Sequence, residues 1–161
     1  MSLLLLALLV AVADEPTHPV VVELDNVCGR DCVAILEKAL AKIDGVKSAE
    51  MYGDKFHFLL QVQDNKVVLP PAILKVTDKI REESKGQEDF PLISVEATLA
   101  GTVDGTTFTA RGSGQKYALK SNDALKALLA AGKTKLTLTG KVTMADKAPV
   151  LEVGDAKETP Q

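Results

Sequence analysis

The chain contains two cysteines, Cys28 and Cys32, and their type and spacing offer its clearest chemistry. Two thiolates can hold a soft ion such as Cu(I) in near-linear coordination, and they suit Zn(II) when further ligands are added. The same pair can close a local disulfide, structural or redox-active, or can persist without any metal. The residues leave these three interpretations open, whereas the Cys-x-x-x-Cys spacing is wrong for a thioredoxin-type enzyme.

Cys32 stands near the expected start of a helix, where the helix dipole favours a thiolate. Arg30 acts in the same direction, whereas Asp31 acts against it. We expect the helix over 31–43, with Asp31 in its first turn and Gly45 as a left-handed cap after its end. Its apolar residues recur at spacings of three and four and predict one inner face, made of Cys32, Ile35, Leu36, Ala39, Leu40 and Ile43.

Strands and helices alternate around the cysteines. Residues 20–24 are mostly β-branched, which favours a strand, and Pro70-Pro71 suits the first turn of a helix. The resulting order, β-α-β-β-α-β, is that of a ferredoxin-like fold with four antiparallel strands and two helices on one face. We expect strands at 20–24, 46–51, 56–62 and 90–103, and helices at 31–43 and 72–83.

The stretch 20–51, VVVELDNVCGRDCVAILEKALAKIDGVKSAEM, resembles the heavy-metal-associated domain of copper chaperones and metal-transporting ATPases. An apolar strand precedes the cysteine pair, and a helix follows Cys32. The sequence Ile43-x-Gly45-Val46 then comes at the distance that the family shows, with a strand after it. The resemblance implies a small α/β module from Val20 to about Phe90, with Cys28 and Cys32 as its metal site.

The cysteine loop departs from the family pattern. The family has Met-x-Cys-x-x-Cys, whereas this chain lacks the Met and spaces Cys28 and Cys32 one residue further apart. Gly29 could absorb the extra residue as a bulge. The resemblance implies a metal-binding protein rather than an enzyme, with Cu(I) as the ion, Zn(II) as the alternative, and a bound ion absent if the pair is oxidised. The protein would either hold the ion or pass it to a protein partner by ligand exchange.

A second group of strands follows the first module. Asp104-Gly105 predicts a hairpin turn, Ser121 can cap a short helix, and Gly140 marks a bend or bulge. The order β-β-β-α-β-β is that of a small OB-like barrel, and the strand at 92–103 could serve both modules. The polar residues from Gly154 onward predict a disordered tail. We expect an α+β protein with a ferredoxin-like module at 18–92, an OB-like β-barrel module at 93–156 and a disordered tail at 157–161.

Other residues with catalytic or ligating side chains are isolated in the sequence. His57 alternates with two phenylalanines and is expected at the surface or edge of its strand. His18 lies in a polar linker, from which it could reach the cysteine loop. Ser113, between two glycines, superficially suggests a nucleophile, but no histidine is expected near it and a flexible loop explains the same residues.

The first thirteen residues, MSLLLLALLVAVA, predict a secretory signal peptide that ends in Ala11-Val12-Ala13. No Lys or Arg precedes the apolar run, and a buried or membrane-resting helix is the alternative. The run is too short to cross a bilayer of about 30 Å as a helix. We therefore expect export to the periplasm or the extracellular space, with no membrane span after cleavage.

The net charge of −3 and an aromatic content of 4% argue against nucleic-acid binding. Such binding needs a basic surface and stacked aromatic side chains, and the lysines and arginines of this chain are scattered. The expected partners are a metal ion and a protein that takes the ion.

Overall fold

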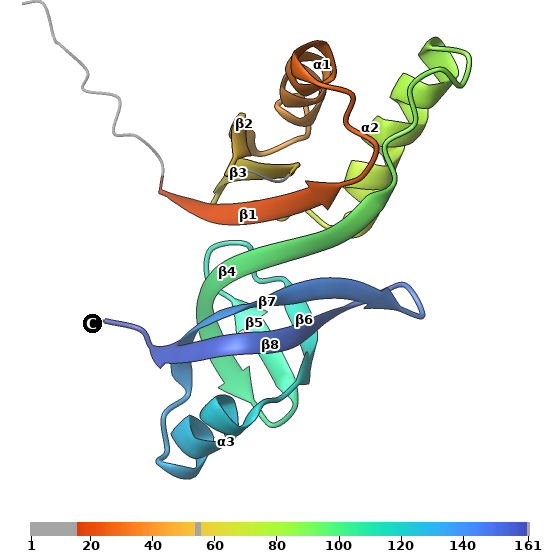
Figure 1. The fold of residues 1–161 in the computed structure, drawn as a ribbon. Helices are drawn as coiled ribbons and strands as arrows, with labels where there is room; N and C mark the ends of the chain where they lie inside the picture. Colours follow the sequence, from red (N-terminus) through yellow and green to blue (C-terminus); the bar gives the residue numbers. More distant parts are fainter. Residues whose placement is uncertain (1–15, 54–55, 161) are drawn as a thin grey trace, which may run out of the picture.

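One long strand, β4 (Leu92–Asp104), connects the N-terminal and C-terminal halves of the protein (Figure 1). The structure is a computed structural model, and it describes residues 16–53 and 56–160. The described strands form one eight-stranded sheet, in the order β2-β3-β1-β4-β5-β6-β8-β7, with an additional pairing between β4 and β7. The elements besides β4 are β1 (Thr17–Leu24), α1 (Arg30–Leu40), β2 (Val46–Tyr52), β3 (His57–Gln63), α2 (Pro70–Glu83), β5 (Thr107–Ala110), β6 (Lys116–Lys120), α3 (Asp123–Ala130), β7 (Lys135–Ala145) and β8 (Ala148–Glu158).

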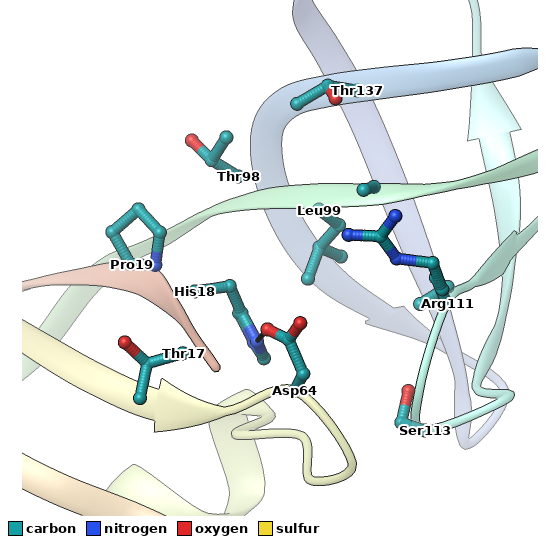
Figure 2. A pocket seen from close by; sticks show the side chains of 11 residues that line it. Thr17, His18, Pro19, Asp64, Thr98, Leu99, Arg111, Ser113 and Thr137 are labelled. Atoms are coloured by element: carbon teal, nitrogen blue, oxygen red, sulfur yellow. Dashed lines mark ion pairs between the residues drawn. The ribbon is translucent and has the colours of Figure 1, made fainter. Parts of the chain in front are cut away.

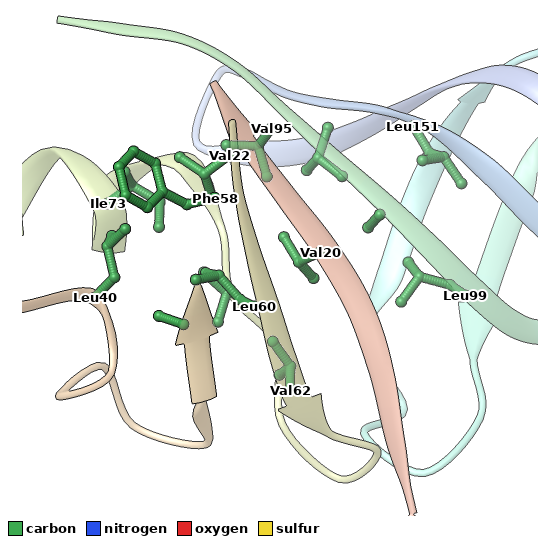
Figure 3. Packing of buried hydrophobic residues seen from close by; sticks show 14 of the residues in the cluster. Val20, Val22, Leu40, Phe58, Leu60, Val62, Ile73, Val95, Leu99 and Leu151 are labelled. Atoms are coloured by element: carbon green, nitrogen blue, oxygen red, sulfur yellow. The ribbon is translucent and has the colours of Figure 1, made fainter. Parts of the chain in front are cut away.

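The N-terminal half consists of β1, α1, β2, β3, α2 and the first part of β4. Its strands lie in the order β2-β3-β1-β4, and all three pairings are antiparallel. Both helices lie on the same side of these strands (Figure 1). Their buried side chains, Leu40 of α1 and Ile73 of α2, lie beside Phe58 of β3 (Figure 3).

The C-terminal half is a closed five-stranded barrel. Its strands follow the order β4-β5-β6-β8-β7, and the barrel closes where Glu96–Thr102 of β4 pairs with Lys135–Lys141 of β7. The β6–β8 pair is parallel, and the other pairs are antiparallel. A small barrel of the OB-like kind, expected from the order of strands, is confirmed.

The two halves share one hydrophobic core because β4 contributes to both. Val20 and Val22 of β1 lie close to Val95 of β4, and further along β4 Leu99 faces the barrel (Figure 3). All of these side chains are nearly excluded from solvent, with at most 3% exposed. Since burial of an aliphatic side chain contributes about 1.5–3 kcal/mol, a continuous core of this kind holds the halves together.

The strand β2 is the outer strand of the N-terminal half and has a strand partner on one side in the described chain. Its pairing with β3 is interrupted by a register shift between Val46 and Ser48. Near its other end, the Met51 N–H donates to a carboxylate oxygen of Glu37 on α1, at 2.9 Å. The Glu37 side chain therefore accepts a hydrogen bond from a backbone N–H of β2 that points away from the sheet.

The first helix is shorter than predicted. It ends at Leu40 instead of residue 43, because Lys42 and Ile43 donate to the carbonyls three residues earlier and tighten the chain toward β2. Gly45 does adopt a positive φ of 84°, but it follows this turn rather than capping the helix. The predicted inner face was wrong at Ile35, which is 38% exposed.

The C-terminal half corrects two further predictions. The cap of α3 is Asn122 rather than Ser121, since the Asn122 Oδ1 accepts the Leu125 N–H at 2.9 Å. The chain from Gly154 was predicted to be disordered, but β8 continues to Glu158, which pairs with Leu136 of β7. Backbone groups make this ladder, so a polar sequence does not prevent it.

Gly140 lies where the register between β7 and β8 shifts, which confirms the predicted irregularity. The predicted signal peptide at 1–13 lies outside the described residues. Across the part of the chain that the structure describes, no helix combines the length and apolarity needed to cross a membrane.

We predict that Gly101→Ala destabilises the barrel by about 1–3 kcal/mol, because overpacking a closed core forces neighbours to move. A Cβ on Gly101 would overlap the Thr109 carbonyl oxygen and lie 2.6 Å from an atom of the Phe108 ring. Urea unfolding measures the loss. Gly154→Ala is the matched control, since its Cβ would lie 3.6 Å from the nearest atom, the Thr139 carbonyl oxygen. Equal unfolding midpoints for the two variants would contradict this account.

Candidate functional site

The structure joins Cys28 and Cys32 in a disulfide at the end of the sheet where β1 leads into α1. Their Cα atoms are 5.6 Å apart. Cys28 lies on the exposed loop, whereas the side chain of Cys32 points into the core and the residue is only 2% exposed. One sulfur of the bond is therefore on the solvent side and the other on the core side.

Two residues of the cysteine loop have a positive φ. Gly29 has a φ of 125°, a conformation that residues with a side chain rarely adopt, and no atom lies near the position of a Cβ. Asn26 also has a positive φ, of 59°, and its N–H bonds to the Asp25 carboxylate at 2.8 Å. The backbone conformation at Gly29 therefore favours glycine at this position between the two cysteines.

The cysteine loop is tied to two neighbouring strands. The Leu24 N–H donates to the Phe56 carbonyl at 3.1 Å, and the Asp25 N–H donates to the Pro91 carbonyl at 2.9 Å. Beneath the loop, Val27 and Phe90 are 6% and 1% exposed. Both side chains belong to the hydrophobic core, so the loop is anchored to a buried apolar base.

The start of α1 provides a favourable electrostatic environment for a reduced sulfur. Cys32 is the third residue of the helix, and Gly29 at its cap position offers no side chain to the first-turn N–H groups. These donors point along the helix axis toward the loop and favour a thiolate there. Arg30 adds a positive charge in the same turn, and Asp31 offsets it.

Exposed apolar side chains lie at the end of β2 and just before β3. Met51, Tyr52 and Phe56 are 46%, 57% and 41% exposed. Because the Phe56 carbonyl accepts the Leu24 N–H, this group lies at the same end of the sheet as the disulfide.

Neither histidine joins the cysteines. His57 lies on the face of β3 opposite the buried Phe58, and its Nε2 is 3.6 Å from the Glu23 carboxylate. His18 sits at the start of β1, six residues before Leu24 and so roughly 20 Å from the loop at the rise of a strand. The suggestion that His18 could reach the cysteine loop is therefore wrong.

His18 instead lies in a pocket between the two halves (Figure 2). We call this the seam pocket; its lining includes His18, Pro19, Asp64, Leu99, Arg111 and Ser113. The His18 Nδ1 is 3.5 Å from an Asp64 carboxylate oxygen, and the His18 side chain is 11% exposed. Burial lowers the pKa of His18 below its ordinary 6.5, and the charge of Asp64 and its hydrogen bond offset part of this shift.

The seam pocket corrects the premise that no histidine lies near Ser113. His18 lines the same pocket, but its recorded partner is Asp64, and the Ser113 hydroxyl oxygen accepts the Gln115 N–H at 3.2 Å. The pocket residues come from distant parts of the chain. No local sequence signal connects them, since the change of strand partners along β4 brings them together.

We predict that reduction of the disulfide lowers the free energy of unfolding by about 2 kcal/mol without unfolding the protein, because the closed loop is short. Urea unfolding with and without a reductant measures the change. Cys28→Ser in the same reductant should match the reduced wild type, since Cys28 is exposed. Loss of the folded state on reduction would contradict the prediction.

We predict that the stability of the protein falls as the pH drops below 6.5, in part because of His18. The folded state binds this proton less tightly than the unfolded chain, so protonation favours unfolding from 6.5 down through the lowered pKa. The variant His18→Gln should show a flatter pH dependence of its unfolding midpoint. An NMR titration midpoint for His18 at or above 6.5 would contradict the prediction.

Within the described residues, no group of three or more His, Cys, Asp or Glu side chains is arranged to hold a metal ion. A two-thiolate site for a soft ion needs no third residue of this kind. Comparison of the chain with protein-family models, curated proteins and solved structures finds no match.

Proposed function

We propose that this is an exported, non-enzymatic protein that holds one soft metal ion, Cu(I) foremost, between the reduced thiolates of Cys28 and Cys32. The disulfide would then be the oxidised, metal-free form of the same site. The observation that carries the proposal is the arrangement of the pair, with one sulfur accessible and one anchored in the first turn of α1.

The fold of the N-terminal half supports this proposal. The element order β1-α1-β2-β3-α2-β4, the strand order β2-β3-β1-β4 and the two helices on one face are those expected of a ferredoxin-like module. We assign this module to residues 18–92 and the barrel to the residues from 93 to the end of β8 at Glu158, with β4 shared. The resemblance of residues 20–51 to the heavy-metal-associated domain then places the cysteine pair at that family's metal site.

The chemistry of the site favours an ion that accepts two ligands. Two thiolates complete a near-linear Cu(I) site, whereas Zn(II) needs four ligands and would require donors from another molecule. Cys28 is exposed, so an incoming thiolate from a protein partner could reach the ion and displace one ligand at a time. The exposed apolar group Met51, Tyr52 and Phe56 offers such a partner a contact surface beside the site.

A structural disulfide is the second candidate, and the bond between Cys28 and Cys32 favours it. In that case the cystine would fix the entry of the chain into α1, and the proposed ferredoxin-like module would serve as an interaction domain. The two candidates differ in what the reduced protein does with a metal ion.

We predict that the reduced protein, from which residues 1–13 have been removed, takes up one equivalent of Cu(I) in competition with a chelator. The measurement is an anaerobic titration followed by the absorbance of the chelator complex. Cys28→Ser should abolish competitive uptake, because a single thiolate cannot complete the site.

Lys38→Gln serves as the matched control, since it changes an exposed residue of α1 and keeps both thiols. It should bind as the wild type does. If the fully reduced wild type fails to compete, and the purified protein has a mass two hydrogens lower than the reduced form, metal binding is excluded and the structural disulfide is favoured.

A further inference from the structure

The seam pocket exists because two paired strands separate. β1 pairs with β4 from Val20 onward, whereas residues 17–19 pair with β3 alone. The edge of β4 that pairs with β1 up to Ala97 pairs with β5 only from Gly101 onward, while β7 pairs with the opposite edge. The space left between the two strands has a volume of about 200 Å³. It is enough for a small molecule, and less than the roughly 300–1,000 Å³ of pockets for larger ligands.

Two charged side chains of opposite sign border this space. Asp64 follows β3, and Arg111 follows β5; in Figure 2 both side chains reach toward the same opening. Backbone hydrogen bonds fix the positions of both residues. The Asp64 N–H donates to the Pro16 carbonyl at 2.9 Å, and the Arg111 N–H donates to the Ala100 carbonyl at 2.7 Å. Gly112 allows the loop after β5 to approach Asp64 closely, because a Cβ at this residue would overlap the Asp64 carbonyl.

Neither charge has a compensating partner at neutral pH. Arg111 forms no ion pair with any residue in the described chain, Asp64 included. The ionic partner of Asp64 is His18, at 3.5 Å, and burial lowers the pKa of His18 below its ordinary 6.5, which favours the uncharged imidazole. The pocket therefore holds one guanidinium and one carboxylate that face a common space without neutralising each other.

The remaining lining leaves few other polar groups for recognition. The hydroxyls of Thr98 and Thr137 already bond to Thr139 and Thr159 at 2.9 Å and 3.1 Å. Pro19, Leu99 and Ala110 provide apolar walls. The Ser113 hydroxyl accepts a hydrogen bond from the Gln115 N–H, so its own proton can still be donated to a ligand.

We propose that the seam pocket binds a small zwitterion, a free α-amino acid with a short apolar side chain. Its carboxylate pairs with the Arg111 guanidinium, whose planar N–H groups match two carboxylate oxygens, and its ammonium pairs with Asp64. The apolar walls accept the side chain. This site is separate from the cysteine pair and does not depend on metal binding.

His18 makes this binding sensitive to pH. The charged groups that line the pocket with it are Asp64 and Arg111. When His18 gains a proton at low pH, it pairs with Asp64 and competes with the ammonium of the ligand. Binding of the amino acid therefore weakens as the pH falls below 6.5.

Titration of the protein with L-alanine, propionate and ethylamine tests the proposal, followed by NMR shifts of the pocket residues and by calorimetry. Alanine should bind saturably. Propionate lacks the ammonium and ethylamine lacks the carboxylate, so each should bind at least about tenfold more weakly, the equivalent of losing one 1.4 kcal/mol interaction.

Substitutions test which ligand group each of the two charged residues binds. Arg111→Gln and Asp64→Asn should each abolish saturable binding of alanine, while Arg81→Gln, an exposed arginine on α2, should leave it unchanged. Arg111→Gln should bind ethylamine at least as tightly as the wild type, because the repulsive guanidinium is gone. Retained binding of ethylamine also shows that the variant is folded.

Two results would overturn the proposal: equal binding of propionate and alanine by the wild type, or alanine binding unaffected in both Arg111→Gln and Asp64→Asn. Cys28→Ser should bind alanine as the wild type does. Failure of the metal site and failure of the amino-acid site are therefore distinguishable.

Discussion

Backbone pairing along β4 is the constraint on which the rest of the molecule depends. The strand bonds to β1 over its first part, to β7 over its middle and to β5 at its end. Buried and exposed or half-buried side chains alternate along the strand. The buried ones form one continuous face that extends from the helix-covered sheet into the barrel: Val95, Ala97, Leu99 and Val103. The small residue Gly101 lets Phe108 and Thr109 of β5 approach the strand closely. Loss of this strand would open both hydrophobic interiors at once.

The position of the cysteine loop depends on the residues just before β4. Pro91, just before β4, accepts a hydrogen bond from Asp25, and Phe90 forms part of the apolar base below the loop. The position of Cys32 is therefore set by the core, whereas that of Cys28 is set by the conformation of Gly29. One cysteine is therefore accessible and the other is anchored in the core. This arrangement suits ligand exchange at the proposed metal site, and it equally allows a reductant to reach the disulfide through Cys28.

Local pattern in the sequence was sufficient to predict most elements. The helix periodicity before Leu40, the Pro-Pro start of α2, the hairpin at Asp104-Gly105 and the irregularity at Gly140 all depend on neighbours in the chain. The errors came where tertiary pairing overrides local character. Polar residues after Gly154 form a strand because β7 supplies a backbone partner, and Ile35 is exposed although it fits the helical stripe. The seam pocket could not be predicted at all, since His18, Asp64 and Arg111 meet only after β4 changes partners.

The outer strand of the N-terminal half has its own consequence. An unpaired edge offers a row of backbone groups to which a second chain can add as another strand, the first step toward ordered aggregates. In β2 this row is interrupted at both ends, by the shift between Val46 and Ser48 and by the carboxylate of Glu37 on the Met51 N–H. A charged side chain on that donor must be displaced and desolvated before another strand can dock. The exposed apolar residues at this end of the sheet can therefore remain uncovered without the neighbouring edge templating polymerisation of the chain.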